Sequence, residues 1–316
     1  MNLPDHVELV EVGLRDGLQS QRRTLPTRLK LRLLEGLLDA GIERVQVVSF
    51  VHPEKVPQMA DAEALCAALP RRDGVVYSGL ALNRRGVERA AAAGLTHVDL
   101  SYSGVEAHSR RNAGMSLDEA QAHVLETVAF ARQLGLEVRG GIQCVFGCLG
   151  EPGPARERLH RMAEHLVEAG AEELALADSA GNATPVQVEA VLEVLADVAA
   201  RVPLVLHLHD TRGAGLANLV TALHHGVRHI YTAFGGLGGC PFIPGAAGNI
   251  ATEDTAHLLH GMGVDTGVDV DAVAAVSALA EDALGISLPS RVYGLWKRQR
   301  ESDPDLKEGD VGADHR

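Results

Sequence analysis

The stretch ARERLHRMAEHLVEAGAEELALAD, residues 155–178, contains the unit from which the fold is predicted. Its first part, up to Gly170, is rich in Ala, Leu and Glu and has the amphipathic pattern of a helix that ends near a glycine. Residues 173–178 form a short apolar run that is typical of a strand, and this run ends on an acid, Asp178. The sequence therefore predicts a helix followed by a strand, with a short turn between them.

The same alternation recurs along the chain. Helices are also predicted at 27–41 and 117–135, and an Ala-Gly pair precedes the next strand at 40–41, 93–94 and 169–170. Eight strands are predicted, at residues 7–12, 44–50, 75–82, 97–103, 137–145, 173–178, 203–210 and 229–237. Eight alternating units predict a parallel sheet closed into a (β/α)₈ TIM barrel. An open doubly wound sheet is the alternative, but no GxGxxG motif follows the first strand.

The length of 316 residues fits one barrel domain. Two more helix-like segments follow the last strand, at 270–285 and 290–300. We therefore expect a single catalytic domain over residues 1–300, with extra C-terminal helices. Residues 301–316 are polar and charged, and a disordered tail is expected there.

Composition narrows the class of partner. Hydrophobic residues make up 46% of the chain and the formal charge is −13, which fits a globular protein and disfavours binding to nucleic acid or an anionic membrane. No apolar run approaches the roughly 20 residues that span a bilayer, and the N-terminus lacks the pattern of a signal peptide. Four cysteines do not make a disulfide scaffold, so a cytoplasmic location is expected. A small anionic substrate remains compatible with these features.

In a TIM barrel the chemistry lies at the C-terminal ends of the strands. Each polar residue at such an end has an ordinary structural explanation by itself: a surface ion pair, a packed histidine, a buried thiol or a helix cap. Together they mark a candidate active site. The residues are Glu11, Arg15 and Asp16 after the first strand, Asp178 after the sixth, His207 and His209 on the seventh, and Cys240 and Asn249 after the eighth.

The types of side chain in this set predict a metal site. His207 and His209 are two residues apart on a strand, so their rings point to the same side. With the carboxylate of Asp16 and the amide oxygen of Asn249 they offer mixed nitrogen and oxygen ligands, which suit a six-coordinate Mg²⁺ or Mn²⁺. Four protein ligands leave two positions for a substrate that chelates the ion.

Five strings of the sequence match one family: VEVGLRDGLQ (10–19), SFVHPEKVPQMAD (49–61), HLHDTRGAGLAN (207–218), GLGGCPF (236–242) and AAGNIATED (246–254). Through them the sequence resembles the hydroxymethylglutaryl-CoA lyase family, within a wider group of metal-dependent barrel lyases and synthases. The resemblance spans roughly residues 7–265. It implies a (β/α)₈ barrel that cleaves a 3-hydroxy-3-methylglutaryl thioester to acetyl-CoA and acetoacetate.

The resemblance also implies roles for individual residues. The metal ligands would be Asp16, His207, His209 and Asn249. Arg15 would face the thioester oxygen, Cys240 would act as a general acid/base, and His207 would be a second proton-transfer group. Glu11 and Asp178 would be supporting acids around the metal and the arginine. The acyl-CoA substrate would contact Arg15, Gln19, Gln46, Arg139, Gly141 and Ala175.

Three of these positions depart from the family pattern: Gln46 replaces an acid, Gly141 a tyrosine and Ala175 a serine. We hypothesise that the lyase chemistry is retained with a different acyl-CoA, such as citramalyl-CoA or a bulkier branched analogue. The alternatives are a condensing synthase of the same barrel group, a metallohydrolase and a non-catalytic paralogue. Assembly as a homodimer is a further expectation.

Overall fold

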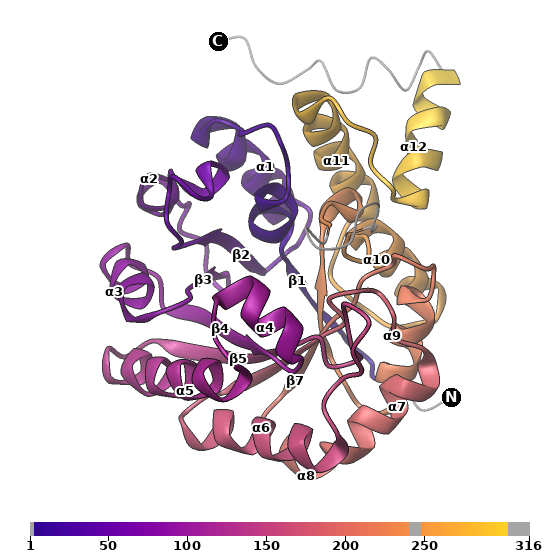
Figure 1. Cartoon of the computed structure of the whole chain (residues 1–316). Coiled ribbons are helices and arrows are strands. Elements are labelled where there is room, and N and C mark those ends of the chain that lie inside the picture. The colour runs from indigo at the N-terminus through magenta and orange to yellow at the C-terminus, as the bar shows by residue number, and fades with distance from the viewer. Residues whose placement is uncertain (1–2, 240–247, 303–316) are drawn as a thin grey trace.

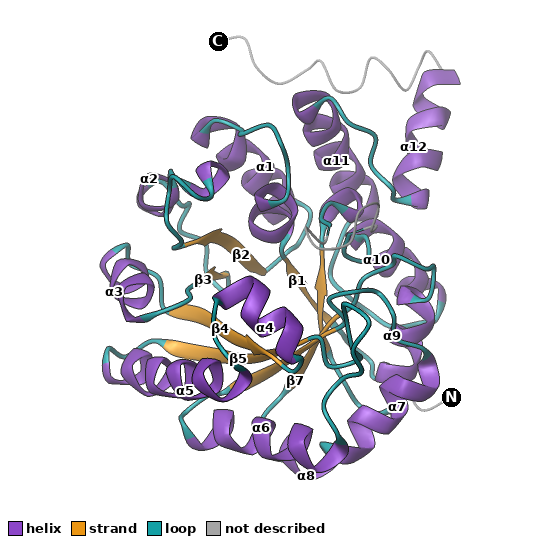
Figure 2. Cartoon of the chain, in the orientation of Figure 1, coloured by secondary structure: helices purple, strands orange, loops and turns teal. Residues whose placement is uncertain are grey.

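The computed structural model describes residues 3–239 and 248–302. Its eight strands are hydrogen-bonded in chain order and close into one parallel barrel (Figures 1 and 2). The prediction of a TIM barrel is confirmed. The strands are β1 Glu8–Glu11, β2 Arg44–Ser49, β3 Val76–Leu80, β4 His97–Ser103, β5 Glu137–Gln143, β6 Glu173–Ala177, β7 Leu204–His207 and β8 His229–Thr232.

Most strands are shorter than predicted at their C-terminal ends. The apolar pattern continues past the last paired residue, as in 203–210, where β7 ends at His207 while Leu208 beyond it is still buried. These residues pack against the barrel without joining the ladder. The extra length therefore belongs to the loops in which active-site residues lie.

Helices surround the barrel (Figure 1). Three short helical turns sit in its loops: η1 Gly13–Gly17, η2 Pro57–Met59 and η3 Phe234–Gly236. The α-helices are α1 Thr27–Asp39, α2 Ala62–Ala67, α3 Arg84–Ala92, α4 Glu106–Ala113, α5 Leu117–Gln133, α6 Arg156–Glu168, α7 Pro185–Val194, α8 Ala196–Ala199, α9 Gly215–His224, α10 Thr252–Gly261, α11 Val270–Leu284 and α12 Arg291–Ser302.

The helices form because each has one apolar face and a defined start. In α1, Leu33, Leu34 and Leu37 recur at helical spacing and are fully buried. Helix α5 begins with a capping box, in which the Ser116 side chain accepts from the Glu119 backbone and Glu119 reaches back to the Ser116 backbone. Strand β2 is buried on both faces over its last five residues, as expected of a strand in a parallel sheet covered by helices.

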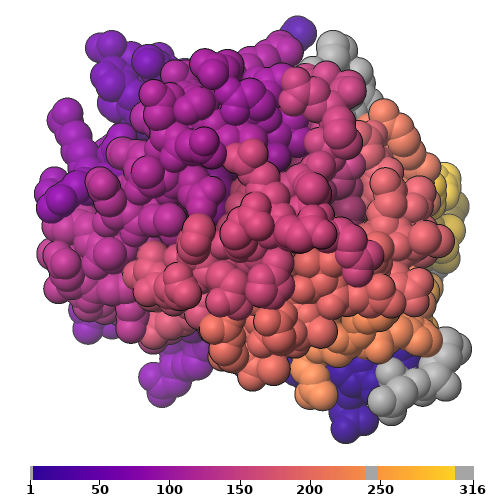
Figure 3. All heavy atoms as spheres, turned by 60° about the horizontal axis from the view of Figure 1, so that its bottom comes forward, coloured from indigo at the N-terminus to yellow at the C-terminus, as the bar shows by residue number. Residues whose placement is uncertain are grey.

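The first and last described segments pack against other parts of the fold. The segment before β1 pairs with the turn after α10, where Val7 N donates to Asp265 O at 2.9 Å. Figure 3 shows the indigo N-terminal residues beside orange residues of the C-terminal half. Helices α11 and α12 pack against α10, and the predicted tail begins inside α12, with 303–316 outside the described residues. Over the described part of the chain, no helix has the length and apolar character needed to cross a membrane.

Candidate active site

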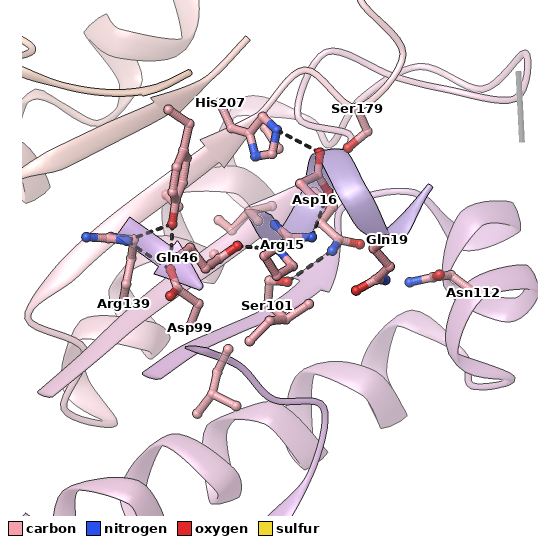
Figure 4. A pocket seen from close by; sticks show the side chains of 18 of the residues that line it. Arg15, Asp16, Gln19, Gln46, Asp99, Ser101, Asn112, Arg139, Ser179 and His207 are labelled. Atoms are coloured by element: carbon pink, nitrogen blue, oxygen red, sulfur yellow. Dashed lines mark hydrogen bonds and ion pairs between the residues drawn. The ribbon is translucent and has the colours of Figure 1, made fainter. Parts of the chain in front are cut away.

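A pocket of about 240 Å³ lies where the C-terminal ends of the strands meet. Helix α4 lies across this mouth in Figure 1 and contributes His108 and Asn112 to the lining. Figure 4 shows charged and amide side chains from opposite sides of the barrel converging here. Nine residues that the sequence singled out line the pocket: Arg15, Asp16, Gln19, Gln46, Arg139, Gly141, Ala175, His207 and His209.

Arg15 and Asp16 are placed by η1, a single π-helical turn directly after β1. The backbone N–H groups of Arg15, Asp16 and Gly17 all point at the carbonyl of Val12, at 3.1, 2.7 and 3.2 Å. Such turns occur often at functional sites because they alter the direction of side chains within a helix. Here the turn brings two consecutive charged side chains to the pocket.

His207 ends β7 and His209 follows it in an isolated bridge to Asn249. The prediction that the two rings face the same side is confirmed, since their Nε2 atoms are 3.2 Å apart. Burial lowers the pKa of His207 to about 4 and also lowers that of His209. Both imidazoles are therefore neutral at pH 7, which is the form that binds a metal.

Asn249 reaches the histidines because residues 248–250 run antiparallel to the residues after β7, where Asp210 N donates to Gly248 O and Ile250 N donates to Leu208 O. Its amide nitrogen donates to Leu237 O at 3.1 Å and to Asp16 Oδ2 at 2.9 Å, which leaves Oδ1 directed at His207 Nε2, 2.5 Å away. Glycine is required beside it: a Cβ on Gly238 would lie 2.7 Å from the Asn249 side-chain nitrogen. A Cβ on Gly248 would meet the Gly238 backbone at 2.6 Å.

These four side chains fit a divalent cation. The ligand atoms of Asp16, His207 and His209 lie within 4.8 Å of one another. Three acceptors, on Asp16, His209 and Asn249, face the Nε2 atom of His207, which carries at most one hydrogen. A cation among these atoms would satisfy all of them. Burial opposes the charge on Asp16, but the charge of Arg15 and the hydrogen bond from Asn249 hold the pKa of Asp16 well below the usual range.

Arg15 lies between this cluster and the barrel floor. Its Nη1 donates to Asp16 Oδ1 at 2.6 Å, and its Nε donates to Gln46 Oε1. The guanidinium is thus fixed at both ends and is only 8% exposed. A fixed guanidinium facing a pocket can stabilise negative charge that develops on a bound molecule.

The floor holds a second cluster that the sequence showed only in part. Arg139 Nη1 donates to Asp99 Oδ1 at 3.0 Å and to the Tyr231 hydroxyl at 2.9 Å, and the hydroxyl donates to Asp99 Oδ1 at 2.5 Å. Asp99 and Tyr231 were not predicted as site residues. The available signal was an acid in the middle of an otherwise apolar strand, HVDL, because such an acid must be paired when buried.

One wall of the pocket is built from small residues on neighbouring strands. Gly141 pairs with Ser101 on β4 and with Ala175 on β6. Gln19 stands near the mouth and accepts from Ser49 Oγ at 2.7 Å. The side chains at this level of β4, β5 and β6 are therefore small, while the turn η1 after β1 brings the charged Arg15 and Asp16 to the pocket.

Glu11 and Asp178 lie behind the pocket and are not among its described lining residues. Glu11 accepts from the backbone N–H groups of Gly13 and Phe234 and from the Thr252 hydroxyl. Asp178 accepts from the N–H groups of Asn182 and Ala183, both at 2.9 Å. The two acids hold the loops that carry the site. Cys240 lies outside the described residues.

Replacing Glu11 with glutamine is expected to change how stability depends on pH. Burial raises the pKa of Glu11 to about 7, against hydrogen bonds that lower it. The folded chain holds this proton more tightly than the unfolded chain, so the contribution to stability is present below pH 4.5 and lost as the pH rises through about 7. The variant should gain about 1 kcal/mol or more relative to wild type between pH 5 and 8. Urea unfolding at several pH values measures the free energy of unfolding of both proteins. A difference between variant and wild type that does not change with pH would contradict the prediction.

Comparison with known proteins agrees with this geometry. A model of the HMGL-like family matches residues 6–280. Hydroxymethylglutaryl-CoA lyase YngG of Bacillus subtilis is 38% identical over 301 residues, covering 94% of this chain and 99% of that protein. The (R)-citramalyl-CoA lyase of Chloroflexus aurantiacus is 39% identical over 296 residues, covering 90% and 93%. The structure of an HMG-CoA lyase from Acinetobacter baumannii, in complex with coenzyme A and 3-methylmalate, has a TM-score of 0.85 at 32% identity and covers 99% of this chain and 98% of that one.

Proposed function

The chain belongs to the HMGL-like family, and from this premise we propose that it is a divalent-metal-dependent lyase that cleaves a 3-hydroxyacyl-CoA to acetyl-CoA and a keto acid. The observation that carries the proposal is one pocket in which Arg15 adjoins the cluster of Asp16, His207, His209 and Asn249. These four side chains would hold a cation that could bind the substrate oxygens, and Arg15 offers a separate positive group for the oxygen of the enolate. Mg²⁺ and Mn²⁺ are the ions we propose, since oxygen ligands with imidazole suit both.

The reaction breaks the bond between C2 and C3 of the acyl chain. The C3 hydroxyl loses its proton, its oxygen becomes the keto oxygen of one product, and the bonding electrons move to the thioester as an enolate. A proton added at C2 then gives acetyl-CoA. A bound divalent ion supplies Lewis-acid activation of the hydroxyl.

The side chains of the pocket have separate proposed roles in charge stabilisation and proton transfer. Arg15 stabilises the enolate oxygen, and its contacts to Asp16 and Gln46 fix the guanidinium before the charge develops. His207 is neutral, which suits it as a second proton-transfer group through the ring nitrogen that does not face the cation site. We propose Cys240 as the group that protonates C2, a role that rests on its motif.

A hydroxymethylglutaryl-CoA-like thioester is the first candidate substrate, because the Bacillus subtilis relative and the Acinetobacter baumannii neighbour are lyases of that thioester. The second candidate is citramalyl-CoA, which one feature of the pocket favours. Among the described lining residues, the Arg and Lys side chains are Arg15 and Arg139, and both already pair with carboxylates. No further cation among them clamps a distal carboxylate. In citramalyl-CoA the carboxylate adjoins the hydroxyl carbon and needs no such clamp, and a relative of that activity matches most of the chain.

Gly141→Ala is expected to discriminate between small and bulky acyl groups. The new Cβ would lie 2.9 Å from the Cβ of Ser101, so Ser101 must shift, and 3.6 Å from the Cβ of Ala175, which is ordinary contact. The added methyl group also takes up space in the pocket that Gly141 lines. We expect a loss of about 1–3 kcal/mol in unfolding free energy and a larger rise in KM for branched substrates than for citramalyl-CoA. Gly261→Ala, which meets nothing within 4 Å, is the matched control. An equal KM change for every substrate would contradict the role of this wall.

The direct test incubates purified protein and Mg²⁺ with each thioester and identifies both products. Hydroxymethylglutaryl-CoA should give acetyl-CoA with acetoacetate, and citramalyl-CoA should give acetyl-CoA with pyruvate. The proposal fails if neither thioester releases acetyl-CoA, or if free CoA is the only thiol product, which would indicate thioester hydrolysis. We further propose a cytoplasmic enzyme that acts as a homodimer, without nucleic-acid or membrane partners.

A further inference from the structure

Gln46 lies between two ion pairs of the pocket, Arg15 with Asp16 and Arg139 with Asp99 (Figure 4). It belongs to β2 and is 1% exposed. Its Oε1 accepts from Arg15 Nε, so its side-chain nitrogen points away from the guanidinium. A neutral amide therefore stands where two ion-pair systems approach each other.

On the other side of Gln46 is Asp99, whose two oxygens have different surroundings. Oδ1 accepts from Arg139 and Tyr231, whereas Oδ2 is buried without a hydrogen bond of regular geometry to the described residues. Burial alone would raise the pKa of Asp99, but the charge of Arg139, followed by the approach of Tyr231, Gln46 and Ser78, lowers it. Asp99 is thus an ionised carboxylate with one oxygen toward the Gln46 amide.

Two carboxylates, Asp16 and Asp99, could each pair with Arg15. Arg15 pairs with Asp16 at 2.6 Å, while Arg139 pairs with Asp99 at 3.0 Å and also with Glu173. If Asp99 drew Arg15 toward the floor, the guanidinium would leave the thioester oxygen. An amide prevents this because it accepts from a guanidinium with its oxygen and donates to a carboxylate with its nitrogen.

We propose that Gln46 is a positioning residue that holds Arg15 toward the substrate by separating it from Asp99, with its amide oxygen on the arginine and its amide nitrogen on the carboxylate. This inference rests on the proposed function for its effect on catalysis. The identity of the residue follows from its two neighbours. A carboxylate here would face Asp99 as a like charge, and an apolar side chain would leave Arg15 Nε and Asp99 Oδ2 unpaired.

A double-mutant cycle tests the proposal. Gln46→Glu alone should lower kcat about tenfold or more, because the new carboxylate repels Asp99 and competes for Arg15. Asp99→Asn alone should also lower kcat, because the charge that balances Arg139 is lost. The double variant Gln46→Glu with Asp99→Asn keeps the total charge and reverses the hydrogen bond, since the amide introduced at position 99 can donate to the carboxylate introduced at position 46. Its kcat should exceed that of the Gln46→Glu variant about tenfold, with KM changed less than kcat.

The outcome that overturns the proposal is a double variant no more active than the product of the two single effects predicts. Full activity of Gln46→Glu would overturn it equally. Gln121→Glu is the matched control, because Gln121 bonds His165 on the outer helices, far from the pocket lining. It should behave as wild type.

The same double-mutant cycle, measured as unfolding free energy instead of kcat, distinguishes failure of this proposal from failure of the proposed function. Urea unfolding of the four proteins measures the coupling between positions 46 and 99 without any substrate. If wild type releases no acetyl-CoA but the double variant recovers stability relative to Gln46→Glu, the proposed function fails and the bridging role stands. If the losses of unfolding free energy in the two single variants add up in the double variant, positions 46 and 99 are not coupled and the bridging role is wrong.

Discussion

Arg15→Met is expected to lower kcat for acetyl-CoA release by about 10²–10³-fold, with a much smaller change in KM. Removing one preorganised donor from a developing oxyanion typically has this effect. The interaction counts mainly in the transition state, because the ground-state thioester oxygen carries little charge. Arg15→Lys should recover only part of the loss, since an ammonium cannot keep both the Nε contact to Gln46 and the Nη1 contact to Asp16.

Steady-state kinetics with a saturating thioester measure this prediction. Arg158→Met is a suitable control, because Arg158 pairs with Asp118 on the outer surface and should have no effect. An Arg15→Met enzyme with kcat within threefold of wild type would show that the enolate charge is stabilised elsewhere. A matching loss of unfolding free energy would instead point to a structural role of the Arg15–Asp16 pair.

His209→Ala is expected to weaken binding of Mn²⁺ and to lower kcat by more than about 10²-fold at a fixed, low metal concentration. The substitution removes one of four converging ligands and leaves Asp16, His207 and Asn249. Added metal should restore part of the activity, because the remaining ligands still form a weaker site. Asp16→Asn should be harder to restore, since it removes the negative charge that balances the ion.

Titration of each variant with Mn²⁺, followed by calorimetry and by activity, measures both effects. His160→Ala is the matched histidine control. Its ring bonds Asp197 on the outer helices, and Glu164 beside it pairs with Arg201. If His209→Ala binds Mn²⁺ as wild type does while His160→Ala does not, the ion belongs to the outer surface rather than to the pocket.

The barrel could be predicted because eight short apolar runs alternate with amphipathic stretches, with Ala-Gly pairs before three of the runs. The nearness of Asp16 to His207 could be predicted for a related reason, because Asp16 lies in the turn after β1 and His207 ends β7. In a parallel barrel such ends must meet at one face. A residue that follows a predicted strand closely in the sequence can therefore be assigned to the C-terminal face of the barrel. Asn249 lies farther along the chain from the end of β8 at Thr232, and its bridge to His209 brings it to the histidines.

The pairing on the pocket floor could not be predicted in this way. Tyr231 and Asp99 are 132 residues apart, and their contact depends on the register of strands across the barrel. Glu11 shows the opposite limit, since it lies near Arg15 in the sequence but points at the Phe234 and Thr252 loops. Nearness to a motif indicates the right end of the barrel, whereas the direction of a side chain follows from packing.

The most direct measurement is acetyl-CoA release from hydroxymethylglutaryl-CoA and citramalyl-CoA before chelation, after chelation and after return of the ion. A divalent-metal lyase at the Asp16–His207–His209–Asn249 site predicts turnover of at least one thioester, its loss with chelator and its recovery with Mg²⁺ or Mn²⁺. Acetyl-CoA release that continues unchanged in the metal-free protein, or none from either thioester in the metal-loaded protein, would contradict it.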